Sequence, residues 1–346
     1  MISRVLIAGV IGATFACSVG LTFAMRRIAL SRGLLDVPNA RSSHQLPTPR
    51  GGGVAIVIAS LLGWAAIFVA GFLKTDVFLA LSGGGLAVAI VGLLDDRFQL
   101  PAQVRLIVHA GAALWALACL GGLPPLQFGD VSVSLGWAGY VLGTLAIIWV
   151  LNLFNFMDGI DGIAASQGIF VAAGGGILAL ATGGGAGSAG SALVFGAACA
   201  GFLLWNWPPA KIFMGDVGSG YVGYVVAVLA LSAARESPPA LAAWFLLGGA
   251  FFVDATVTLL RRLYRRDPVL TAHRTHAYQW LARRWGSHLR VTLAFWLVNV
   301  GWLLPWAWAV LAGKAGAAWV LLAALLPLCL VAVLAGAGEP EARERG

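Results

Sequence analysis

The sequence contains little charge and no paired cysteines. Asp, Glu, Lys and Arg make up only 10% of its 346 residues, while 60% are apolar and the mean hydropathy is +0.89. This composition excludes an ordinary soluble domain and favours a membrane protein that crosses the bilayer several times. The cysteine spacing predicts neither a disulfide nor a metal site, so we expect all four to be inert packing residues. They are Cys17, Cys119, Cys199 and Cys329.

The apolar residues lie in long runs without strand-like alternation. Such runs predict helices, because backbone groups in lipid must satisfy their hydrogen bonds within a helix or a closed barrel. Windows of about 18–22 residues predict an all-α polytopic fold of about eleven transmembrane helices, in a single integral membrane domain over 1–346. The runs begin near Val5, Gly52, Val77, Val104, Ala138, Ile163, Ser191, Val217, Ala240, Val291 and Ala317.

The basic residues set the expected orientation. With the N-terminus outside, six segments face the cytoplasm, and they carry 18 of the 22 Lys and Arg residues. The C-terminus is then cytoplasmic as well. The net charge of +8 reflects this topology and contact with anionic membrane lipids, so we expect no nucleic-acid partner. The cytoplasmic segments are 26–50, 95–105, 158–162, 206–216, 261–290 and 337–346.

Five aspartates fall at the cytoplasmic ends of apolar runs. Ionisable groups at the edge of a bilayer are costly and usually functional. Two of them follow an apolar run directly, where the helix dipole disfavours acids; this indicates a bound cation, or a general base beside a metal-bound phosphate. Carboxylates that converge from several helices predict a site for a divalent cation and phosphate. The five are Asp95, Asp96, Asp158, Asp161 and Asp216.

Polar neighbours extend this predicted site. Asn152 and Asn155 precede Asp158 at helical spacing. They either turn into the same cavity, at a helix break made by Gly159 and Gly162, or form hydrogen bonds between helices.

Asp216 is predicted to begin a spanning helix, where it either serves a ligand site or simply caps the helix. Phe213 beside it stacks on a base or packs against other side chains. Lys211 contacts phosphate or extends its ammonium group towards the membrane surface.

The late basic loop offers a second group of polar side chains. His273, Arg274 and His276 would present two imidazoles and a guanidinium together, which suits phosphate binding during phosphoryl transfer. A basic helix on the membrane surface is the alternative, and it is the better interpretation of 277–290. His288, in that stretch, is expected to be solvated.

The other loops carry fewer signals. His44 and Arg50, in the first basic loop, either touch phosphates or belong to an ordinary loop. On the outer face, alternation in 121–136 predicts a small hairpin, and the glycine-rich stretch 181–191 predicts a flexible loop.

Taken in order, these motifs resemble a known family. D-V-P-N-A-R-S-S-H with P-T-P-R-G-G, L-L-D-D-R-F, N-x-x-N-x-x-D-G-I-D-G-x-A, F-M-G-D-x-G-S and H-R-T-H-A-Y-Q span residues 36–279. The same order is typical of polyprenyl-phosphate N-acetylhexosamine-1-phosphate transferases, which include MraY and WecA. The eleven-helix layout resembles the WecA branch, and the versions of the motifs are most similar to WbpL-like enzymes that initiate O-antigen synthesis.

The resemblance implies a reaction and a cofactor. A UDP-N-acetylamino sugar would give its sugar-1-phosphate to undecaprenyl phosphate at the cytoplasmic face of the bacterial inner membrane, with Mg²⁺, or Mn²⁺ in its place. By motif, Asp216 would ligate the metal and Phe213 would stack on uracil. His273 and His276 would face the diphosphate.

The remaining roles implied by the resemblance concern the other acids. Asn155, Asp158 and Asp161 would line the nucleotide and metal site, while Asp95 or Asp96 would help to deprotonate the lipid phosphate or lie at its entry. A homodimer is possible, as in related enzymes. The sequence does not choose the sugar among GlcNAc, FucNAc and QuiNAc.

A secondary transporter with intramembrane carboxylates is the alternative from another class. Transporter acids should lie in the middle of their segments, whereas the five aspartates lie at segment ends. Asp254 is the nearest to an exception.

Overall fold

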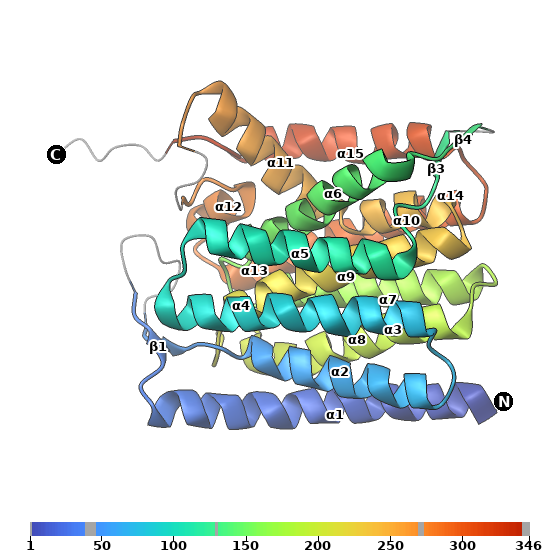
Figure 1. Cartoon of the computed structure of the whole chain (residues 1–346). Helices are drawn as coiled ribbons and strands as arrows, with labels where there is room; N and C mark the ends of the chain where they lie inside the picture. Colours follow the sequence, from blue (N-terminus) through green and yellow to red (C-terminus); the bar gives the residue numbers. More distant parts are fainter. Residues whose placement is uncertain (1, 39–45, 129–130, 269–272, 341–346) are drawn as a thin grey trace.

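A computed structural model of the chain describes residues 2–38, 46–128, 131–268 and 273–340, and these form a bundle of long helices (Figure 1). In chain order the elements are α1 (Ile2–Ser31), β1 (Leu35–Asp36), β2 (Thr48–Pro49), α2 (Gly53–Val69), α3 (Thr75–Leu79), η1 (Ala80–Gly84), α4 (Gly85–Phe98), α5 (Ala102–Leu120), β3 (Leu126–Phe128), β4 (Val131–Val133), α6 (Gly136–Phe156), α7 (Ile163–Ala181), α8 (Ala186–Asn206), α9 (Asp216–Glu236), α10 (Pro239–Leu247), α11 (Gly249–Tyr264), α12 (Ala277–Trp285), α13 (His288–Val298), η2 (Asn299–Leu303), α14 (Leu304–Leu311) and α15 (Ala317–Leu334).

The all-α polytopic prediction is confirmed, and each predicted run contains a helix. Within the described residues, nine helices are long and apolar enough to cross a membrane. The other two predicted runs differ in shape: α2 has only 17 residues, and α10 and α11 are bent by 73° at a short break. Hydropathy windows detect apolar composition and not direction, so they could not show this bend.

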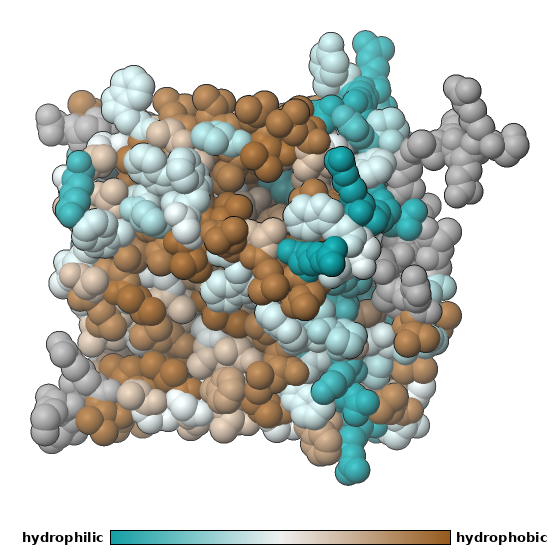
Figure 2. Space-filling model, turned by 180° about the vertical axis from the view of Figure 1, so that it is seen from behind, coloured by the Kyte–Doolittle hydropathy of each residue, from teal (hydrophilic) through white to brown (hydrophobic). Residues whose placement is uncertain are grey.

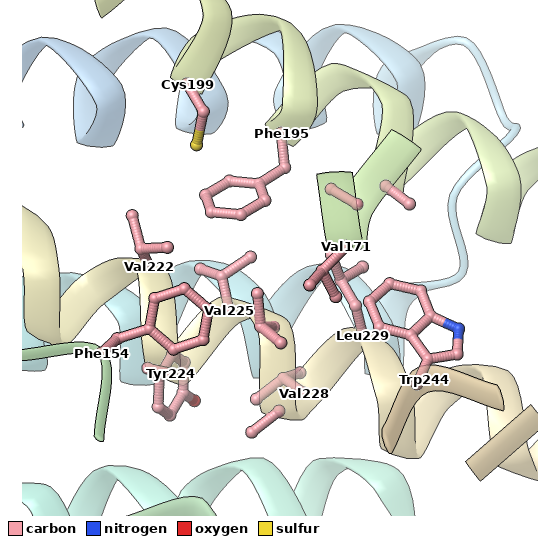
Figure 3. Packing of buried hydrophobic residues seen from close by; sticks show 14 of the residues in the cluster. Phe154, Val171, Phe195, Cys199, Val222, Tyr224, Val225, Val228, Leu229 and Trp244 are labelled. Carbon is pink, nitrogen blue, oxygen red and sulfur yellow. The ribbon is translucent and has the colours of Figure 1, made fainter. Parts of the chain in front are cut away.

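Helix α9 occupies the centre of the bundle. It contacts α2, α4, α5, α6, α7, α8 and α10, and nearly all of its length is buried. Figure 3 shows Val222, Tyr224 and Val225 of α9 among side chains from its neighbours. Cys199 lies in this packing, as expected for an inert cysteine. Because α9 is held on all sides, its first residue, Asp216, has a fixed position.

The two ends of the bundle differ. The end that carries the β1 and β2 loop, α12 and the last turns of α4 and α6 also carries the C-terminal segment, whereas helix α1 begins at the opposite end (Figure 1). Hydrophilic side chains gather along one edge of the molecule, beside a broad apolar surface (Figure 2). The segments predicted to be cytoplasmic therefore share one end of the structure.

The predictions for the opposite end had mixed outcomes. Strands β3 and β4 pair antiparallel, which confirms the hairpin. The flexible loop predicted over 181–191 is wrong, because α8 already begins at Ala186. Its glycines serve close packing instead: a Cβ on Gly187 would collide with the carbonyl of Phe72, and one on Gly190 would touch Ile7.

Candidate active site

Two loops meet edge to edge and place the site at the start of α9. The Phe213 amide donates to Pro49 O (2.8 Å), and the amides of Gly52 and Gly53 donate to Phe213 O and Met214 O, both at 2.9 Å. The P-T-P-R-G-G-G and F-M-G-D motifs therefore run beside each other. This contact delivers Arg50 to the first residue of α9.

Glycines make the approach of three helices possible. A Cβ on Gly53 would collide with the backbone of Gly218, and one on Gly92 would lie 2.6 Å from Asp216 O. Gly215 has φ +75°, in the left-handed region that favours glycine, and its Cβ would lie 2.6 Å from the Asp96 carboxylate. Helices α2, α4 and α9 can meet at Asp216 only because these side chains are missing.

Arg50 joins two of the predicted carboxylates. Its Nη2 lies 2.7 Å from Asp96 Oδ1 and 3.0 Å from Asp216 Oδ1. Asp96 also accepts the amides of Asp216 (2.9 Å) and Val217 (3.2 Å), the first two of α9. A carboxylate at a helix N-terminus satisfies free amides and is favoured by the helix dipole. Asp96 therefore caps α9 from α4.

The adjacent acids of α4 have different surroundings. Asp95 accepts a short bond from Arg105 Nη1 (2.6 Å) and the amide of Leu100 (2.7 Å), so it closes the turn between α4 and α5. The sequence pair thus divides into one carboxylate that pairs with Arg50 and one that pairs with Arg105 at a turn, beside the Asp216 carboxyl.

The turn after α6 brings the next acids. Gly162 has φ +76° and ends the break between α6 and α7, as predicted. Asp161 accepts the amide of Ala210 (3.0 Å). Burial raises the pKa of the Asp158 carboxyl well above its usual range, and the charge of Asp216 adds to this shift while Arg50 opposes it.

The two asparagines have different partners. Asn155 Nδ2 donates to Asp216 Oδ1 (3.2 Å) and to Ser219 Oγ (3.0 Å), so it belongs to the site. Asn152 donates to Ile148 O one turn back on its own helix (2.8 Å). Of the two alternatives for these residues, the cavity applies to Asn155.

A polar pocket of about 220 Å³ opens among these groups. A second one of about 630 Å³ adjoins it and shares Asp161, Gln279 and His288 with it. Arg274 and Arg283 line the second pocket. The first pocket is lined by Asp36, Arg50, Asn155, Asp158, Gly159, Ile160, Asp161, Asn206, Phe213, Met214, Gly215, Asp216, Ser219, Gln279 and His288.

The late-loop histidines lie beside this pocket rather than on its wall. The His273 and His276 rings stack with centroids 5.0 Å apart, and His273 Nδ1 lies 3.0 Å from Thr275 Oγ1. Burial lowers the pKa of His273 to about 4, with His276 and Arg262 contributing. His273 is therefore neutral near pH 7.

The structure does not place two of the predicted substrate contacts on the pocket walls. Lys211 is exposed, and its ammonium nitrogen lies 5.6 Å from the centroid of the Trp205 ring, outside both pocket walls. His44 lies outside the described residues.

Sequence reasoning missed several residues of the pocket. His288 was expected to be solvated, which is wrong: its Nδ1 lies 3.3 Å from Asp161 Oδ1, and its side chain is only 19% exposed. Ser219 lies one turn after Asp216, on the same helix face, and this spacing could have revealed it. Asn206 joins two loops, accepting the Gly162 amide and donating to Ile212 O; nothing in its local sequence marks this role.

The fold and the site define a class: an all-helical membrane protein with an acidic, arginine-bridged pocket at one end of the bundle. A model of the family described as Glycosyl transferase family 4 matches residues 78–234. A Bacillus subtilis (strain 168) protein named probable undecaprenyl-phosphate N-acetylglucosaminyl 1-phosphate transferase is 30% identical over 285 residues, covering 81% of this chain and 78% of that protein.

Two further relatives come from other bacteria. The decaprenyl-phosphate N-acetylglucosaminephosphotransferase of Mycolicibacterium smegmatis is 31% identical over 325 residues, covering 81% of this chain and 78% of that protein. The phospho-N-acetylmuramoyl-pentapeptide-transferase of Moorella thermoacetica is 30% identical over 235 residues, covering 61% and 70%. The chain therefore belongs to glycosyl transferase family 4, the MraY and WecA superfamily, which disfavours the transporter alternative.

Proposed function

We propose that the protein transfers an N-acetylamino-sugar-1-phosphate from a UDP-sugar to undecaprenyl phosphate, releasing UMP and undecaprenyl-diphospho-sugar. The relatives are named for transfer of this kind to polyprenyl phosphates. The product would initiate O-antigen or a related cell-envelope glycan. By the positive-inside rule the pocket faces the cytoplasm, where a nucleotide sugar is available.

One observation carries this proposal: the arginine-bridged carboxylates open into a polar pocket at the end of an apolar bundle. Arg50 links Asp96 to Asp216, and Asp216, Asp158 and Asn155 line the pocket. A lipid acceptor can keep its polyprenyl chain in the bilayer while its phosphate reaches a pocket at the end of the bundle. A soluble donor can enter the same pocket from the aqueous side.

The reaction is phosphoryl transfer. An oxygen of the lipid phosphate attacks the β-phosphorus of the donor, a new P–O bond forms, and the bond from the β-phosphorus to the bridging oxygen breaks. UMP leaves with that oxygen and its electron pair. Catalysis of this step depends on positioning and charge neutralisation. Arg50 supplies a fixed guanidinium at the pocket wall, and Asn155 holds the Asp216 carboxylate in place.

The residues fit a divalent cation. Mg²⁺ is usually held by one or two carboxylates together with substrate phosphates and water. Asp216 lines the pocket through a carboxylate that Arg50 and Asn155 hold at Oδ1, so it is the acid best placed to ligate the ion. Acids outnumber basic groups on this wall. When bound, Mg²⁺ or Mn²⁺ would neutralise charge on the transferring phosphoryl group.

The second pocket suits the sugar end of the donor. Arg274 and Arg283 line it, and Gln279 and His288 lie where it joins the first. Phe213 lies on the wall of the first pocket, where we expect it to contact the uracil ring. His273 lies beside the pocket wall and is neutral at pH 7, so it would contribute hydrogen bonding and not a positive charge.

The lipid phosphate must lose any proton it carries before it attacks. Asp96 already accepts two amides and pairs with Arg50, and Asp95 pairs with Arg105, so both act mainly as structural anions. Asp158 lines the pocket, and its raised pKa makes its ionised form a stronger base, so it is the best placed proton acceptor once a bound cation favours that ionised form. We favour direct attack over a two-step route through an aspartyl phosphate.

A reconstituted assay tests the function. Purified protein in nanodiscs receives Mg²⁺, undecaprenyl phosphate and, in turn, UDP-GlcNAc, UDP-FucNAc and UDP-QuiNAc, and UMP release is measured. We expect release with one or more donors, dependent on both lipid and cation. Failure with all three would overturn the proposal. Exchange of labelled UMP into the donor without lipid would replace direct attack by the two-step route.

A further inference from the structure

The transfer reaction does not account for a carboxylate buried inside α11. Asp254 is 2% exposed and lies among the apolar residues of that helix. Its partners in the described part of the chain are the amides of Ala277 and Tyr278 (both 2.9 Å), the Thr258 hydroxyl (3.2 Å) and His276 Nδ1 (3.4 Å). Both carboxylate oxygens therefore accept hydrogen bonds from the surrounding fold.

This arrangement fixes the beginning of one helix to another. Ala277 and Tyr278 are the first two residues of α12, and the first amides of a helix have no partner within it. A carboxylate that accepts them forms charge-assisted hydrogen bonds, which are strong in a dry environment. Asp254 thus caps α12 from α11, as Asp96 caps α9 from α4.

Helix α12 in turn touches the catalytic pocket. The Tyr278 hydroxyl donates to Phe156 O (2.9 Å), at the end of α6 and two residues before Asp158. A Cβ on Gly159 would collide with the same hydroxyl and would lie 3.0 Å from Gln279 Nε2. Gln279 lines both pockets. A shift of α12 would therefore be felt directly at the pocket wall.

The segment before α12 is held from the other side. The Gly338 amide donates to Thr275 O (2.7 Å), and Arg262 Nη2 donates to Pro268 O (2.7 Å). Arg261 binds Ala337 O (2.6 Å), which fixes the C-terminal segment in turn. These bonds restrain the approach to α12. The separate contribution of Asp254 is to set the position of the helix start.

We propose that Asp254 is a positioning residue for the transfer reaction. Through the first turn of α12 it holds Tyr278 against the end of α6 and Gln279 on the walls of both pockets. This inference rests on the proposed function, because it assigns Gln279 to the donor side. It predicts that loosening Asp254 weakens use of the nucleotide sugar and leaves use of the lipid acceptor unchanged.

The test combines kinetics with hydrogen exchange. In Asp254→Asn, an amide group replaces one acceptor and faces a backbone N–H, so one cap bond is lost. We expect the KM for the donor to rise about tenfold, as for one buried polar group left unpaired, with the KM for undecaprenyl phosphate within about twofold. Exchange in segment 273–285 should speed up, while α9 peptides remain unchanged.

Two further variants separate positioning from general stability. Thr258→Val removes a hydroxyl that donates to Asp254 but keeps the α12 cap, so it should behave like the parent protein. Tyr278→Phe removes the link to Phe156 O, and its effect on the donor KM should not add to that of Asp254→Asn, because both act through one path.

The possible results all decide the question. A fall in Vmax with both KM values unchanged, or faster exchange spread over the whole bundle, would show a merely structural role and overturn the inference. Additive effects of the two substitutions would also overturn it. If the parent protein transfers no sugar phosphate, the proposed function fails, and the exchange data then report separately on whether Asp254 holds α12.

Discussion

Two carboxylates play the same local role in different surroundings. Asp96 caps α9 and Asp254 caps α12, each from a neighbouring helix. Asp96 is bridged by Arg50 to a pocket-lining acid, whereas Asp254 faces His276 in a sealed contact. An acid in a membrane helix can therefore belong to the chemistry or to the scaffold, and its partners distinguish the two cases.

The sharpest way to break this comparison is to remove the pocket acid next to Asp96. Asp216→Asn keeps the shape of the side chain but loses the charge that faces the phosphates, so turnover should fall by about 10³-fold or more. UMP release measures it. Asp76→Asn is the matched control, because Asp76 pairs with Arg235 at the opposite end of the bundle and should leave the rate unchanged. A near-normal rate for Asp216→Asn would remove Asp216 from the metal role.

The arginine bridge comes next. Arg50→Lys keeps the positive charge but cannot hold two carboxylates in a fixed fork, so we expect kcat to fall by about 10²-fold. Lys211→Met is the control cation: its ammonium group lies over Trp205, and its loss should change the rate by less than about twofold. Equal losses for both would contradict the assignment of Arg50 to the pocket.

Asp158 should separate activity from stability. Its pKa is raised on folding, so the folded state keeps a proton that the unfolded chain releases as pH rises above about 4. Stability is therefore lost as pH rises towards the shifted pKa. Asp158→Asn removes this cost: in buffer without divalent cations it should melt at a higher temperature than the parent at pH 7, while turnover falls by about 10²-fold. The melting temperature and turnover of Asp158→Asn are compared with those of Asp36→Asn, a substitution on the same pocket wall.

The smallest expected effect concerns His273, which stacks on His276 beside Asp254. Because the pKa of His273 is lowered to about 4, the unfolded chain binds a proton first, and stability is lost as pH falls from about 6.5 to about 4. His273→Asn should flatten this part of the profile of melting temperature against pH. The rate at pH 7 should change by less than about tenfold. An unchanged profile would show that burial of His273 does not oppose its protonation.

The sequence was informative about polar side chains that lie at helix ends. Asp158, Asp161, Asp216 and Asn155 could be predicted because polar groups at the end of apolar runs are costly near lipid, and Phe213 was found from its place beside Asp216. Asp36, Asn206 and His288 could not, because they reach the pocket through contacts between loops far apart in the chain. The bend between α10 and α11 also escaped, since composition carries no information on direction.

The role of Asp254 could not be predicted from its local sequence either. Its place within an apolar segment made it the nearest of the acids to the pattern expected of a transporter, and only its three-dimensional partners reveal a helix cap. Asp95 and Asp96 are adjacent and chemically identical, yet one closes a turn and the other joins the Arg50 cluster. Local pattern predicts that such groups matter but does not assign their roles.

The glycine contact of α2, α4 and α9 has a consequence for mutational tolerance. A methyl group on Gly53, Gly92 or Gly218 would meet backbone or a buried methionine, so the helices would separate and Asp216 would leave Arg50. A saturation library selected for function should therefore accept only glycine at these positions, while lipid-facing Leu86 and Leu93 of α4 accept many apolar residues. The reaction therefore depends on three glycines that do not touch the substrate, because a side chain at any of them would push the helices apart.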